Sequence, residues 1–217
     1  MKTINTGGVT FIELVPGGTS EWYYGNSLTH GDLYEAEELF RDGRYIEGND
    51  LFLIHYPDGE LCRPVPKKDG TYFGNPVFLD ESIYILNVDF SQSVIQIYCF
   101  HCDSRQTELA AWLPLDSVKD CYNLQLHTAP LSLTRQGSDN MFEIIWPEHI
   151  SFEMHPHESF FLRDGDKLYF SKWYEEGEGA DYRYWEETVV RDLSGNMTEV
   201  LLGDVMVMPD GQKWHLV

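Results

Sequence analysis

The sequence predicts an all-β fold built from repeated small antiparallel sheets, and three observations support this prediction. Aromatic residues, which pack well on pleated surfaces, make up 14% of the chain. Tight Asp-Gly turns lie between segments of alternating apolar residues, a pattern typical of β-hairpins. These turns recur at nearly regular spacing, which indicates a repeated structural unit.

The clearest hairpin is predicted at residues 161–170, where an apolar run meets Asp164-Gly165 and alternation follows. Weaker versions of this pattern occur at residues 39–46, 77–85, 118–124 and 207–216. The aspartates of these five segments, here called the anchor aspartates, are Asp42, Asp80, Asp120, Asp164 and Asp210. Consecutive anchors are about 38 to 46 residues apart, close to the roughly 40 to 45 residues of a four-stranded propeller blade.

The pattern therefore resembles a small β-propeller, and the prediction is one propeller-like domain over residues 1–217 with five blades of about 42 residues. Little chain follows Asp210, so the C-terminal strands would join the N-terminal strands in one closing blade, which leaves fewer exposed strand edges. The alternatives are four blades, or an antiparallel barrel or sandwich. No Trp-Asp, Gly-His or kelch glycine motif is present, so the resemblance concerns the fold and implies no function.

In chain order, residues 9–14 and 21–24 are predicted to form the first hairpin, and residues 50–56 and 60–65 the second. Residues 32–41 have the composition of a helix, although they occupy the place of a strand in the repeat. The other predicted strands cover residues 82–88, 94–100, 108–113, 122–127, 131–135, 141–146, 151–154, 181–191, 198–202, 205–208 and 214–217.

The charge balance argues against two classes of partner. The chain has 15 Lys and Arg against 36 Asp and Glu, a net charge of −21, which repels nucleic acids and anionic membranes. The first residues lack the apolar core of a signal peptide, so none is expected, and no apolar run approaches the roughly 18 residues of a membrane span. Four cysteines do not indicate a disulfide framework at this length, so a reduced, cytoplasmic setting is expected.

Three patterns could bind metal, but a structural interpretation is favoured for each, so neither a metal site nor a cofactor is predicted. A ring of anchor aspartates would suit a divalent cation, yet aspartate is common in such turns because it caps the backbone. Cys99 and Cys102 have zinc-like spacing, but residues three apart in a strand point to opposite faces. His149, His155 and His157 form a cluster that is more typical of a solvated connection.

The tryptophans offer a better candidate for a binding surface than the three possible metal-binding patterns. Trp112 and Trp214 fall within predicted strands and are expected in the core, whereas Trp173 and Trp185 flank an acidic loop. The predicted ligand-binding residues are Trp173, Tyr174, Tyr182, Trp185 and Asp164. Aromatic faces and acidic groups suit a protein surface or a sugar.

These features favour a non-catalytic intracellular binding or scaffold module that presents one propeller face to a protein or to a small polar ligand, such as a carbohydrate. The alternative is a carbohydrate-active hydrolase that uses Asp and Glu at the channel mouth, and a divalent-metal protein is a third hypothesis. No nucleophile elbow, Walker motif or His-Glu-x-x-His motif is present, so the sequence does not decide whether the protein is an enzyme. It also leaves the oligomeric state open.

Overall fold

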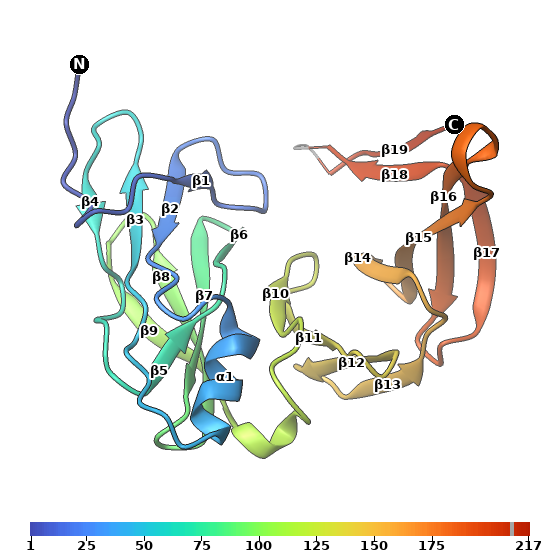
Figure 1. Cartoon of the computed structure of the whole chain (residues 1–217). Coiled ribbons are helices and arrows are strands. Elements are labelled where there is room, and N and C mark those ends of the chain that lie inside the picture. Colours follow the sequence, from blue (N-terminus) through green and yellow to red (C-terminus); the bar gives the residue numbers. More distant parts are fainter. Residues whose placement is uncertain (209–210) are drawn as a thin grey trace. The chain divides into compact units, whose positions relative to one another are not determined.

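The computed structural model describes residues 1–208 and 211–217, without the side chain of Ala180 (Figure 1). The chain divides into two compact units, Met1–Thr128 and Ala129–Val217. The single domain over residues 1–217 remains a prediction.

Two sheets make up most of the first unit. The first sheet has the strand order β1 (Glu13–Leu14), β2 (Trp22–Asn26), β3 (Leu51–His55) and β4 (Leu61–Cys62). The second has the order β5 (Thr71–Phe73), β7 (Ser82–Asp89), β8 (Val94–His101) and β9 (Thr107–Pro114), and β6 (Val77–Leu79) pairs with β7. Trp22 and Leu53 of the first sheet share one apolar core with Ile83, Ile85 and Phe100 of the second.

Helix α1 (Leu33–Arg41) belongs to the first unit and forms where the sequence composition predicted it. Asp32 accepts a hydrogen bond from the amide of Glu35, whose side chain accepts one from the amide of Asp32, so a capping box starts the helix. Asp42 is its C-cap and therefore does not form a hairpin turn. The segment 118–124 is also wrong as a hairpin, because Asp120 lies in a loop between η1 (Leu115–Ser117) and β10 (Gln125–His127).

The second unit begins with β11 (Ser132–Gln136), β12 (Met141–Trp146) and β13 (Ile150–Glu153), which follow one another in their sheet. The next sheet has the order β14 (Glu158–Asp164), β15 (Lys167–Glu176), β16 (Arg183–Asp192) and β17 (Met197–Leu202). The short helix η2 (Gly179–Asp181) connects β15 to β16, and β18 (Asp204–Val207) pairs with β19 (Lys213–Leu216).

Aromatic rings fill the core of the second unit. Phe170 of β15 is fully buried, and its ring centroid lies 5.2 Å from that of Phe142 and 5.5 Å from that of Phe160. Leu168 and Val189 belong to the same cluster. The predicted hairpin at residues 161–170 is thus confirmed as β14 and β15, with Gly165 in a left-handed turn.

The all-β class and the fold-level resemblance to a β-propeller are confirmed, since small antiparallel sheets of consecutive strands make up the chain. Four sheets of four or five strands are present in the described residues, so the alternative with four blades agrees and the five-blade count is not confirmed. The shared closing blade is wrong, because β1 and β2 pair with β3 and β4 while β18 and β19 form a two-stranded sheet of their own. Asp210, the last anchor, lies outside the described residues.

Across residues 1–208 and 211–217, no helix has both the length and the apolar character needed to cross a membrane.

Candidate functional site

The hairpin of β15 and β16 is longer than its neighbours in the sheet. The two strands pair from Lys167 and Asp192 to Glu176 and Arg183. In contrast, the pairing of β14 with β15 reaches only Lys172, and the pairing of β17 with β16 reaches only Glu187. Residues 173–185, here called the hairpin tip, therefore extend beyond the paired neighbours, as the labelled strands in Figure 1 indicate.

Two aromatic rings stack across the hairpin tip. Tyr174 and Trp185 lie directly opposite each other in the register, with ring centroids 5.1 Å apart and planes only 6° from parallel. The Lys172 ammonium lies 5.0 Å from the centroid of the Tyr174 ring, a cation–π contact. Because side chains alternate along a strand, this stack is on the face that carries the buried Phe170 further down β15.

Trp173 lies on the other face of the hairpin, since it is the residue before Tyr174. Its ring stacks on that of His157, with centroids 3.9 Å apart and an interplanar angle of 13°. The two tryptophans that flank the acidic loop in the sequence are thus on opposite faces, and each has a different stacking partner. The sequence alone does not show that the two tryptophans are on opposite faces, because this depends on the pairing register of β15 and β16.

Tyr182 and Tyr184 are the most exposed aromatic residues of the hairpin tip, at 51% and 52%. The Tyr182 hydroxyl donates a hydrogen bond to Glu175 at 3.1 Å, and the Tyr184 hydroxyl donates one to Glu186. These hydrogen bonds to carboxylates raise the pKa of both tyrosines, because they stabilise the protonated phenol.

The fifth predicted residue is separated from the other four. Asp164 ends β14 beside the Gly165 turn, at the opposite end of β15 from the hairpin tip, and forms an ion pair with Lys213. Two further tryptophans contradict the sequence prediction: Trp112 is 56% exposed and Trp214 is 50% exposed, so neither is in the core. Trp22, in contrast, is buried.

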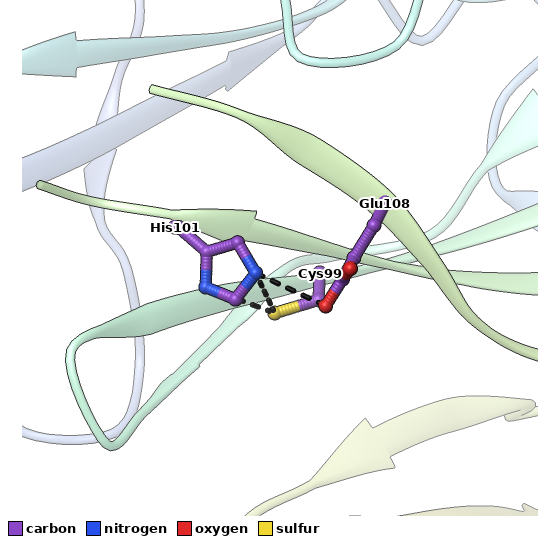
Figure 2. A group of neighbouring side chains, drawn as sticks. All are labelled: Cys99, His101 and Glu108. Atoms are coloured by element: carbon purple, nitrogen blue, oxygen red, sulfur yellow. Dashed lines mark hydrogen bonds and ion pairs between the residues drawn. The ribbon is translucent and has the colours of Figure 1, made fainter. Parts of the chain in front are cut away.

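A second cluster of reactive side chains lies in the first unit, on the sheet of β7, β8 and β9 (Figure 2). Cys99 and His101 are two residues apart on β8, and Glu108 of β9 is directly opposite Cys99. The His101 Nε2 atom lies 3.1 Å from a carboxylate oxygen of Glu108, and the Cys99 sulfur lies 3.9 and 4.0 Å from the two ring nitrogens of His101. Of the residues described, these three form the group of metal-binding type.

This cluster was missed because the sequence argument paired Cys99 with Cys102. Cys102 instead packs in the apolar core beside Phe100, while Cys99 is on the other face of β8. Strand alternation could have indicated that Cys99 and His101 share one face of β8, with Phe100 on the other. Only the pairing register of β8 with β9 places Glu108 beside them. His149, His155 and His157 are all exposed and do not belong to this group.

Comparison with known proteins finds no family. No family model matches the chain, and no curated protein matches it. Among solved structures, the chain is similar to Porphyromonas gingivalis dipeptidyl peptidase 4, with 12% identity and a TM-score of 0.45. The similarity covers 92% of this chain and 32% of that one.

Proposed function

We propose that the protein is a non-catalytic binding module whose hairpin tip contacts a basic segment of a partner protein. The observation that carries this proposal is the stacked pair Tyr174 and Trp185, which lies beyond the paired ends of the neighbouring strands in a segment rich in carboxylates. Aromatic side chains are enriched in binding surfaces, because they offer a large contact area at a small cost in conformational entropy.

Charge complementarity selects the kind of partner. The segment of residues 172–187 has two cations, Lys172 and Arg183. Its carboxylates are Glu175, Glu176, Glu178, Asp181, Glu186 and Glu187. A lysine or arginine of the partner would gain charge-assisted hydrogen bonds from these groups and a cation–π contact from the rings. The contact between Lys172 and Tyr174 supports this mode of binding within the chain itself.

A small polar ligand, such as a carbohydrate, is the other occupant that the aromatic surface would suit. The hydrolase alternative relied on equivalent anchor aspartates around a channel. Asp42 ends a helix and Asp120 lies in a loop, so that alternative has no specific observation in its favour.

The experiment measures binding of a fluorescent peptide that alternates arginine and glycine, by anisotropy at several salt concentrations. We expect the double variant Tyr174→Ala/Trp185→Ala to bind at least about 10-fold more weakly than the parent, since loss of a central aromatic contact costs about 2 kcal/mol. Trp112→Ala removes an exposed tryptophan from the first unit and is the control, with unchanged binding.

Equal affinity for the peptide in the parent and in the double variant would show only nonspecific attraction to an acidic protein, and would overturn the proposal. The same proteins are titrated with neutral oligosaccharides while the tryptophan fluorescence is recorded. A saturable response that requires Trp185, without peptide binding, would assign the hairpin tip to a sugar instead.

A further inference from the structure

We propose that Cys99, His101 and Glu108 bind one zinc ion, with a fourth coordination position open to solvent. The three side chains project from one face of the sheet formed by β7, β8 and β9, and one ligand atom of each lies within 4.8 Å of the others (Figure 2). This site is independent of the hairpin tip, which belongs to the other unit.

The distances between the ligand atoms match a tetrahedral zinc site. Zinc bonds of about 2.0 to 2.3 Å place a nitrogen and an oxygen ligand about 3.3 Å apart, and a sulfur and a nitrogen ligand about 3.6 Å apart. The observed distances are 3.1 Å from His101 Nε2 to the Glu108 oxygen and 4.0 Å from His101 Nε2 to the Cys99 sulfur. Small side-chain rotations would therefore complete the geometry.

The backbone around these residues is well suited to hold ligands in place. β8 is the middle strand of the three: Cys99 lies opposite both Tyr84 of β7 and Glu108 of β9, and the His101 amide donates a hydrogen bond to the carbonyl of Gln106. Ser82 of β7 is opposite His101, and its hydroxyl oxygen lies 3.4 Å from His101 Nδ1. An Nδ1–H group that donates to Ser82 leaves the Nε2 lone pair free for a metal, and metal-binding histidines usually donate their other ring N–H to such an acceptor.

The solvent exposure of the His101 and Glu108 side chains would let an ion reach the site and would leave its fourth coordination position open to water. Cys99 is only 4% exposed, whereas the side chains of His101 and Glu108 are 42% and 67% exposed. An ion could thus enter from solvent and reach the buried sulfur. Sites with three protein ligands usually retain water at the fourth position.

The donor set selects the metal. A thiolate, an imidazole and a carboxylate suit zinc, whereas calcium and magnesium prefer oxygen ligands alone. A thiolate and a carboxylate together also neutralise the charge of a divalent cation. The competing interpretation is an ordinary surface ion pair between His101 and Glu108 beside a buried thiol, which requires no metal.

The test uses the full chain, freed of metal by a chelator and titrated with zinc in competition with a chromophoric chelator. We expect one zinc ion per chain, and at least about 10-fold weaker affinity for Glu108→Gln, a change at an exposed position that leaves the fold intact. Ser82→Ala should weaken binding by about 10 to 100-fold. Glu153→Gln, at another exposed carboxylate, is the control with unchanged affinity.

Cobalt substitution tests the sulfur ligand. The parent protein loaded with Co²⁺ should show the sulfur-to-cobalt charge-transfer absorption of a tetrahedral thiolate complex, and Cys99→Ser should abolish it. Cys102→Ala removes a buried thiol three residues away and should leave the absorption unchanged. Absence of stoichiometric zinc binding, or equal affinity in Glu108→Gln and the parent, would overturn the proposal. So would loss of the charge-transfer band in Cys102→Ala.

Discussion

The two ends of the β15–β16 hairpin have the same backbone pairing but differ in their surroundings. At the base, Phe170 and Val189 are opposite each other and are buried by rings from β12 and β14. At the tip, Tyr174 and Trp185 are also opposite each other and on the same face, yet both are only partly buried. The difference arises because β14 and β17 accompany the hairpin only at its base.

The same type of cross-strand pair is therefore buried in the core at one end of the hairpin and partly exposed at the other. A cross-strand pair is part of the core when strands flank it on both sides and side chains of another sheet pack on its face. A pair in two strands without further paired neighbours keeps part of its apolar area exposed to solvent.

The largest effect is expected at the base of the hairpin. Phe170→Ala removes a fully buried ring that contacts Phe142, Phe152 and Phe160, and should lower the free energy of unfolding by about 4 kcal/mol. Urea denaturation provides the measurement. Tyr174→Ala, four residues along the same face, is the matched control with a loss of about 1 kcal/mol. Similar losses at the two positions would contradict the comparison.

A buried ion pair also belongs to the base. Arg191 donates hydrogen bonds of 2.9 to 3.1 Å to both carboxylate oxygens of Glu158, and both side chains are almost inaccessible to solvent. Glu158→Gln leaves the guanidinium buried without its counter-charge and should cost about 3 kcal/mol.

The control for the ion pair is the double variant Glu158→Leu/Arg191→Met, in which no charge stays buried. It should recover most of the stability lost in Glu158→Gln, as measured by the urea midpoint. A double variant that is less stable than the single one would show that the hydrogen bond from Arg191 to the carbonyl of Gly195 matters more than the charge.

A smaller and local effect is expected at the tip. Trp185→Ala removes one ring of a stacked pair, a contribution of about 1 kcal/mol. Amide hydrogen exchange should become faster in residues 173–185 and stay unchanged around Phe170, because the tip can open without the core. Faster exchange throughout β15 and β16 would show that the two ends unfold as one.

The smallest effect concerns tyrosine titration at the tip. Glu175→Gln removes the carboxylate that raises the pKa of Tyr182, so this pKa should fall towards the ordinary value of about 10. NMR titration of ¹³C-labelled tyrosine side chains measures the change. Glu178→Gln is the matched control, since Glu178 is not among the groups that shift Tyr182. An unchanged pKa in Glu175→Gln would show that the hydrogen bond is not populated in solution.

Local patterns predicted several elements correctly. The Asp-Gly turn at 164–165 fixed the hairpin of β14 and β15, and helix propensity located α1 in spite of the repeat argument. The five-blade count was not confirmed, since Asp42 and Asp120 resemble turn residues locally but end a helix and occupy a loop. Tight turns share composition with other chain reversals, so spacing alone could not separate them.

The sequence by itself determined the strand-rich composition, the acidic charge and the aromatic residues near the loop at 175–179. Tertiary structure decided which of these residues meet. Trp173 and Trp185 were separated to opposite faces by the period of a strand, while Cys99, His101 and Glu108 were brought together across β8 and β9. The physical reason is that alternation fixes the face of each side chain within a strand, but only the pairing register between strands fixes its neighbours.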